Sequence, residues 1–158
     1  MKIKQPLIIF LLLFPGIIYP QTTQHLRSTW ENTSFKDSLR FGAALELLGI
    51  IAPENPDSAK AFAETIINEV KIKGNRRWET IFTKQYAQII DENGDLEKAE
   101  TYYWLYHQLS VTTVDSVSMA DALDLVSDLY RRKAYFDDAL RHRQRSIGIY
   151  MALNDTTG

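Results

Sequence analysis

Three histidines are the side chains best suited to metal binding or proton transfer, and they lie far apart in the sequence. His25, His107 and His142 each lack a second ligand at the spacing of a zinc site. A metal centre needs several ligands that converge, so we interpret each histidine as a surface or interfacial residue. The sequence therefore predicts no metal site.

An acidic segment over residues 91–95 shares some features with a calcium loop. In such a loop the glycine stands sixth and a bidentate glutamate stands twelfth. Here Gly94 is fourth and Tyr102 is twelfth, so we interpret the segment as a turn between helices. The chain also lacks a glycine-rich phosphate loop, a nucleophile elbow and any cysteine. We therefore expect a protein that is not an enzyme and that uses no cofactor.

The composition fits one folded domain and argues against a nucleic-acid partner. The chain has 158 residues, of which 45% are hydrophobic and 24% are charged, and its net charge is −2. Without Lys2 and Lys4, which belong to an N-terminal export segment, 16 basic residues face 20 acidic ones and the net charge becomes −4. Phosphate binding is driven by clustered Lys and Arg. The basic groups of this chain are isolated, so we expect no nucleic-acid partner.

The first 20 residues have the pattern of a secretory signal peptide. Lys2 and Lys4 precede an apolar stretch over residues 7–19, which is interrupted by a proline and a glycine. The stretch is 13 residues long, whereas about 20 are needed to span a bilayer. The segment around Pro20 lacks the small residues that signal peptidase prefers, so an uncleaved membrane anchor stays open. We expect an exported protein, periplasmic or extracellular, with residues 1–20 as signal peptide or anchor.

The rest of the chain divides into a predicted linker and a predicted repeat domain. Residues 21–36 are polar and show no sustained hydrophobic period, so we expect a linker there. Within the domain, residues 37–158, two segments match each other at an offset of 40 in the numbering. Residues 90–99 and 130–139 align large apolar residues with each other and Ala99 with Ala139. Small residues at these places allow two helices to approach closely beside a tight turn.

Helical patterns flank both aligned segments, and a third, more diverged copy precedes them. Apolar residues recur at spacings of three and four on either side of each turn, which is typical of amphipathic helices. In the third copy Pro53 and Pro56 break the helical pattern, and we expect Asp57 or Ser58 to cap the next helix. The sequence therefore predicts an all-α fold of six helices in three antiparallel hairpins.

With the hairpins placed, these residues resemble the tetratricopeptide repeat. That family has Leu-Gly and Tyr in its first helix, and Ala, an aromatic and a small residue in its second. The best copy consists of Leu123, Val126, Ser127, Tyr130, Phe136, Ala139 and Ser146. The middle copy consists of Tyr86, Ala87, Ile90, Gly94, Leu96, Ala99 and Tyr103, and the first of Leu45, Leu48, Gly49 and Ala61. The last copy departs from the pattern at Arg143, where an aromatic is usual. The resemblance implies a right-handed solenoid of about three helix hairpins.

The offset between the two matching segments exceeds the period of about 34 residues that is usual for this repeat. We expect the extra residues in the connection Ser110–Asp115. Residues 146–158 also resemble the junction between repeats in the sensory regions of bacterial two-component kinases.

In this family the first helix of each hairpin lines a concave face on which peptides lie. Carried over by position, the expected partner-binding residues are Lys84, Gln88, Asp124, Asp128 and Arg131, with Asp91 and Asp121 beside them. Such a mixed, partly acidic groove implies a peptide with some positive charge, although these residues could equally be solvated ones without a partner. Gln88 and Leu125 stand where family members that clamp a C-terminal carboxylate need Asn, so we do not expect that clamp.

Two further surfaces outside the groove could contact other helices or a partner: the one around Trp104 and the outer face of the last predicted helix. On a helix, Tyr103 and Tyr106 share the face of Ala99, whereas Trp104 points to the convex side or to the neighbouring repeat. The last predicted helix carries Leu140, Ile147, Tyr150 and Met151, although terminal repeats need a polar outer face. We expect this helix to dock on a partner, to associate with a second copy of the chain, or to continue into a longer protein.

Together these features predict an exported protein–protein interaction scaffold built of tetratricopeptide-like repeats. The alternative is the truncated sensory region of a repeat-containing signalling receptor, either a histidine kinase or a transcriptional regulator. In both cases the partner is a protein or peptide, and a membrane is involved only through an uncleaved N-terminal segment.

Overall fold

A computed structural model describes residues 18–155 of the chain, and the side chains of residues 22–154. Over these residues the chain forms seven helices and no strand. The helices are α1 (Ile18–Glu31), α2 (Asp37–Glu54), α3 (Pro56–Ile72), α4 (Arg76–Glu92), α5 (Leu96–Thr112), α6 (Ser116–Arg132) and α7 (Phe136–Asp155). The all-α prediction is thus confirmed for the described residues. Most of the predicted signal segment, residues 1–17, lies outside them.

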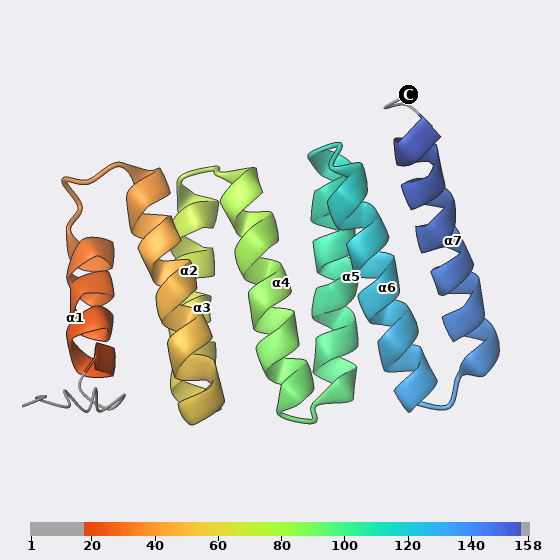
Figure 1. The fold of residues 1–158 in the computed structure, drawn as a ribbon, viewed down its shortest axis with the longest axis horizontal. Coiled ribbons are helices and arrows are strands. Elements are labelled where there is room, and N and C mark those ends of the chain that lie inside the picture. Colours follow the sequence, from red (N-terminus) through yellow and green to blue (C-terminus); the bar gives the residue numbers. More distant parts are fainter. Residues whose placement is uncertain (1–17, 156–158) are drawn as a thin grey trace, which may run out of the picture.

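The helices lie in a row that follows the order of the chain, from α1 at one end to α7 at the other (Figure 1). Each helix packs against the helix before it and the helix after it, and α2 also contacts α4. The six helices predicted from the hydrophobic spacing are α2 to α7. The core therefore runs lengthwise through the row rather than filling one central globule.

Helix α1 is a difference from the sequence-based expectation, which placed a linker over residues 21–36. Leu26 and Trp30, four positions apart and hence on one face, are both buried against the next hairpin. The Trp30 ring lies 5.9 Å from the Phe41 ring and 5.8 Å from the Phe62 ring. Two large apolar residues are too few to produce a visible hydrophobic period, but they suffice to dock a helix. The connection is shorter than expected and spans residues 32–36.

The turns that separate α3 to α7 repeat one backbone geometry at equal intervals along the chain. Each turn has a residue with positive φ, namely Gly74 (66°), Gly94 (86°), Val114 (55°) and Ala134 (63°). In the first turn the amide of Asn75 donates to the Val70 carbonyl at 2.9 Å, and the other three turns have the same bond. This is the Schellman closure, which satisfies the last carbonyls of a helix. The identical turns impose the same reversal of direction four times.

Side-chain caps begin three of the four helices that follow these turns, namely α4, α5 and α6. The side chains of Asn75, Asp95 and Asp115 each accept a hydrogen bond from the amide three positions on. Asn55 caps α3 in the same way, by accepting from the Ser58 amide at 3.0 Å. The cap of α3 is thus Asn55 rather than Asp57 or Ser58, because Pro56 starts the helix as its first residue, where no amide hydrogen is needed.

The long repeat period comes from long helices and not from a long loop. Helices α3, α4, α5 and α6 each have 17 residues and are joined by short, uniform turns. The prediction that the extra residues form a connection over Ser110–Asp115 is therefore wrong, since α5 continues to Thr112 and the turn after it is as short as the others. The 40-residue offset seen in the sequence is thus the length of two such helices with their turns.

Small and aromatic residues fill the core at corresponding places. Ala59, Ala99 and Ala139, at equal intervals in the sequence, are all buried near the start of α3, α5 and α7. Aromatic rings pack between α2 and α4, where the Phe41 ring lies 5.6 Å from the Trp78 ring and 6.2 Å from the Phe82 ring. The alanines allow the helix backbones to approach, and the rings fill the wider space between successive hairpins.

Candidate functional site

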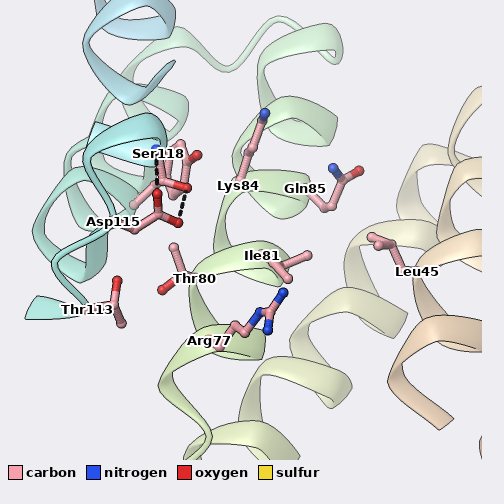
Figure 2. Close-up of a pocket in the computed structure, with 10 residues that line it drawn as sticks. Leu45, Arg77, Thr80, Ile81, Lys84, Gln85, Thr113, Asp115 and Ser118 are labelled. Carbon is pink, nitrogen blue, oxygen red and sulfur yellow. Dashed lines mark hydrogen bonds between the residues drawn. The ribbon is translucent and has the colours of Figure 1, made fainter. Parts of the chain in front are cut away.

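An open depression of about 610 Å³ lies where α4 faces α2 on one side and the start of α6 on the other. We call it the α4 pocket. Figure 2 shows Arg77, Ile81 and Lys84 of α4 between Leu45 of α2 and the pair Asp115 and Ser118 of α6. The pocket is lined by Leu45, Arg77, Thr80, Ile81, Lys84, Gln85, Tyr106, Thr113, Asp115 and Ser118. Arginine, lysine, amide and hydroxyl groups thus surround an apolar floor.

The carboxylate of Asp115 at the edge of the pocket is occupied by the helix that it caps. The Ser118 amide donates to Oδ1 at 3.0 Å, and the Ser118 hydroxyl donates to Oδ2 at 2.8 Å. The hydrogen bond from the Ser118 amide makes the largest contribution to lowering the pKa of Asp115. The bond from the Ser118 hydroxyl and the positive charge of Arg77 lower this pKa further. Asp115 is therefore ionised at neutral pH and serves mainly to hold the start of α6.

Lys84, one of the predicted partner-binding residues, is neutralised within a partly buried network. Its Nζ lies 2.9 Å from Asp121 Oδ2, and the Tyr106 hydroxyl donates to the same oxygen at 2.9 Å. Burial, together with the neighbouring Asp121 carboxylate, raises the pKa of Tyr106, so the phenol keeps its proton and acts as donor. Lys84 thus links α4 to α6, and its charge is largely compensated within the wall of the pocket.

Arg77 is the cation of the pocket that is not held by an ion pair. Its side chain is exposed, and no other described residue forms a hydrogen bond or salt bridge with its guanidinium. A guanidinium offers five donors in a planar fork that fits a carboxylate. Asp115 and Asp121 balance the formal charges of Arg77 and Lys84, and the exposed guanidinium of Arg77 is the group of the α4 pocket that is free to bind a carboxylate.

Three other predicted residues, Gln88, Asp128 and Arg131, meet in a second, smaller depression of about 310 Å³. It begins one helical turn further along α4 than Lys84. The Gln88 side chain accepts a hydrogen bond from Gln85 at 3.4 Å, and Arg131 Nε lies 3.8 Å from Asp128 Oδ1. The predicted residues therefore do not gather in one site, since Lys84 lies in the α4 pocket, three others line the second depression, and Asp124 lines neither.

Arg143 changes the charge of this surface in a way that the sequence did not reveal. It reaches from α7 to α6, where its guanidinium nitrogens lie 3.0 Å from Asp124 Oδ1 and 2.9 Å from Asp128 Oδ1. Two of the carboxylates expected to make the groove acidic are thus paired within the protein. The departure from the repeat pattern at Arg143 was the one sign of this pairing in the sequence.

Tyrosine, carboxylate and cation meet at three further helix interfaces. Tyr103 of α5 donates to Asp91 of α4 at 2.9 Å, and Arg132 of α6 contacts the same carboxylate at 2.5 and 2.6 Å. Tyr130 of α6 donates to Glu100 of α5 at 2.7 Å, and Lys133 does so at 2.8 Å. These groups join neighbouring helices, so they are unavailable to a ligand.

The third of these interfaces joins α3 to α4 through the Tyr86 hydroxyl, which donates to Glu64. The Lys98 ammonium of α5 lies 5.3 Å from the centre of the Tyr86 ring. Burial raises the pKa of Tyr86, and so does its hydrogen bond to Glu64. The Tyr86 hydroxyl thus stays protonated and links α4 to α3.

Two of the three histidines lie in an aromatic cluster between α5 and α7. The Trp104 ring is 5.6 Å from the His107 ring and 5.2 Å from the buried His142 ring, and Tyr130 is 5.4 Å from His142. Burial lowers the pKa of both histidines, and the charge of Arg145 lowers it further. Trp104 thus points to the neighbouring repeat unit. Over residues 18–155 no three His, Asp or Glu side chains gather as metal ligands would.

Comparison with known proteins gives no relative from which a function could be transferred. No protein-family model matches the chain, and no curated protein matches it. Within the described residues, no helix combines the length and hydropathy required to cross a membrane. Function therefore has to be argued from the α4 pocket and from the surfaces around it.

Proposed function

We propose that the chain is a protein-binding scaffold of tetratricopeptide-like repeats, and that its partner peptide lies along α4 in the α4 pocket. The observation that carries this proposal is an open pocket with an unpaired guanidinium, Arg77, above an apolar floor of Leu45 and Ile81. A pocket with a few polar groups around apolar side chains is the usual form of a binding site. We propose binding rather than catalysis, with no cofactor and no nucleic acid.

The repeat assignment is supported by the regular register of the chain. The turns and the hairpins recur at constant intervals, and the alanines that resemble the family pattern are buried at the interfaces between helices. A constant step between hairpins is what winds such repeats into a right-handed superhelix with a concave face. In that arrangement α2, α4 and α6 would form the concave face, and the α4 pocket would lie on it.

The pairing of charges defines the chemistry of the partner. Asp121, Asp124 and Asp128 are each in contact with a cation of the protein, whereas Arg77 is not held by a carboxylate. We therefore propose an acidic peptide as the partner, in place of the positively charged one expected from the sequence. The fitting segment has an Asp or Glu for Arg77 beside an apolar side chain for Leu45 and Ile81.

We further propose that the protein is exported, on the pattern of residues 1–20 alone. The scaffold would then act in the periplasm or outside the cell, and would stay on the membrane if the segment is not cleaved. The similarity of residues 146–158 to a junction in sensory kinases keeps a signalling receptor as the second candidate. A reading frame that continues into a transmitter domain would favour that second candidate.

The test of the proposed function is selection of peptides followed by measurement of their affinity. A random peptide library displayed on phage should yield sequences enriched in Asp or Glu next to an apolar residue. In calorimetry, Arg77→Ala should weaken the best peptide about tenfold or more, because a charged hydrogen-bonding pair is lost. Arg141→Ala serves as the matched control, since Arg141 is also exposed but lies on α7, paired to Asp138 at 3.0 Å. Equal loss in both variants, or no enrichment of acidic peptides, would remove the α4 pocket from consideration.

A further inference from the structure

Helix α7 carries a stripe of large apolar side chains that no described residue covers. The stripe consists of Phe136, Leu140, Ile147 and Met151, and these side chains are 64%, 59%, 48% and 62% exposed. Spacings of four, seven and four positions place them on one face of the helix. We call this face the α7 stripe. Helix α7 packs against α6, and its His142 ring lies 5.2 Å from the Trp104 ring of α5, but His142 does not belong to the stripe.

On the earlier helices, the positions that correspond to the stripe are covered near the middle of the helix and open toward its end. On α5 they include Glu100, which binds Tyr130 and Lys133, the half-buried His107, and Val111, which is 50% exposed. On α3 they include Ile67, which is buried, and Lys71, which is exposed. The middle of this face thus accepts a helix. On α7 the polar Glu100 is replaced by Leu140, so the occupant that fits is an apolar helix.

The order of residues along the stripe is symmetric about its centre. Phe136 and Met151 are equally far from a point midway between Arg143 and Gln144, and so are Leu140 and Ile147. If two copies of α7 run antiparallel about a twofold axis at that point, Phe136 meets Met151 of the second copy. Leu140 meets Ile147 in the same way. A twofold interface requires such self-complementarity.

The charges around the axis agree with this arrangement. No residue of the stripe is charged, and Gln144, at the axis, can both donate to and accept from its own copy. Arg143 also lies near the axis, but its guanidinium is directed to α6, where Asp124 and Asp128 hold it at 3.0 and 2.9 Å. The sulfur of Met151 beside the ring of Phe136 is a favourable contact as well.

We infer that the chain forms a twofold dimer in which the α7 stripes of two copies pack antiparallel, with Leu140 against Ile147 of the second copy. This dimer is independent of the proposed peptide site, because the α4 pocket lies on other helices. The result is a pair of scaffolds joined at their α7 ends, each with its pocket free.

The first test is sedimentation equilibrium of the full chain. The wild type should be dimeric at tens of micromolar, whereas the double variant Leu140→Asp with Ile147→Asp should raise the dimer Kd about 100-fold or more. Both residues are exposed in one copy, so the helical circular dichroism should stay unchanged. The control is Ile72→Asp, which removes an apolar side chain that is 87% exposed on α3. A monomeric wild type, or association that the double variant leaves intact, would overturn the inference.

The second test uses the absence of cysteine from the chain to distinguish antiparallel from parallel pairing. Gln144→Cys should form a disulfide with its own copy, because the two positions meet at the axis. Leu140→Cys should cross-link with Ile147→Cys when the two proteins are mixed. Leu140→Cys alone should not, since seven positions separate the copies by about 10 Å along the helix, beyond the about 7 Å reach of a disulfide. Rapid cross-linking of Leu140→Cys with itself would show a parallel or different contact and would contradict the inference.

Discussion

Helices α5 and α7 are each the second helix of a hairpin and match at an offset of 40 residues, yet they differ in what surrounds them. Helix α5 packs between α4 and α6, while α7 packs on α6 and touches α5 through the rings of His142 and Trp104. At corresponding positions α5 has the buried Tyr103 and α7 has the half-exposed Arg143. On α5, which has a helix on both sides, the position holds the Tyr103 ring, whose hydroxyl is hydrogen-bonded to Asp91. On α7 it holds Arg143, whose guanidinium folds back onto α6 of the same hairpin.

The strongest test of this comparison is truncation at the two positions. Tyr103→Ala should lower the free energy of unfolding by about 3–5 kcal/mol, because it opens a cavity and leaves Asp91 with Arg132 as its partner. Arg143→Ala should cost about 1 kcal/mol or less, since the ion pairs that it removes are partly exposed. Urea denaturation followed by circular dichroism measures both. A cost for Arg143→Ala equal to that of Tyr103→Ala would break the comparison.

A weaker effect should appear as a pH dependence of the contact between α5 and α7. The pKa values of His107 and His142 are lowered by folding, so the unfolded chain binds protons more readily than the folded one. The free energy of unfolding should therefore be highest above pH of about 6.5 and fall as the pH drops through the folded values. Urea midpoints between pH 8 and 5 measure this.

The variant that sharpens the pH experiment is His142→Phe, which keeps a ring beside Trp104 and removes one titrating group. Its midpoint should depend less on pH than that of the wild type. His25→Gln is the control, because His25 is exposed on α1. A wild-type midpoint that does not change between pH 7 and 5 would contradict the burial of these histidines.

The smallest effect concerns the turns at which α5 ends and α7 begins. Val114 and Ala134 have positive φ, a region in which side chains with a Cβ are strained. Val114→Gly and Ala134→Gly should each raise the free energy of unfolding by about 0.5–1 kcal/mol. Gly94→Ala, in the same backbone geometry with nothing within 4 Å of the new Cβ, should lower it by about 1 kcal/mol. Thermal unfolding of the three variants and of the wild type measures these differences. If all four proteins melt at the same temperature, the positive φ at these turns does not strain the residues with a Cβ, and the prediction is wrong.

Most of the helices could be predicted from the sequence, because the apolar spacing and the alanines at the turns are local features. Helix α1 was missed because only Leu26 and Trp30 mark its buried face. The lengths of the helices were also missed, since nothing at Ser110 shows that α5 continues there. In both cases the missing information is tertiary: a helix that packs well extends further than its own pattern indicates.

The candidate site was harder to predict than the fold. Lys84 was placed on the surface that forms the α4 pocket, but Arg77, on the same face of α4, was not selected. The pocket takes its shape from α2, α4 and α6 together, and sequence spacing within one helix does not report which carboxylates are already paired. Arg143 neutralises Asp124 and Asp128 from the following helix, so the sign of the charge preference depends on the folded structure.

The uniform short turns have a consequence for how the length of such a protein can change. Because the chain follows the same path at Gly74 and at Val114, a tandem duplication of residues 75–114 would need no new connecting segment. The inserted pair of helices would begin with its own asparagine cap and end with its own closed turn. Gene duplication in whole multiples of this unit would therefore lengthen the row while leaving the existing junctions as they are.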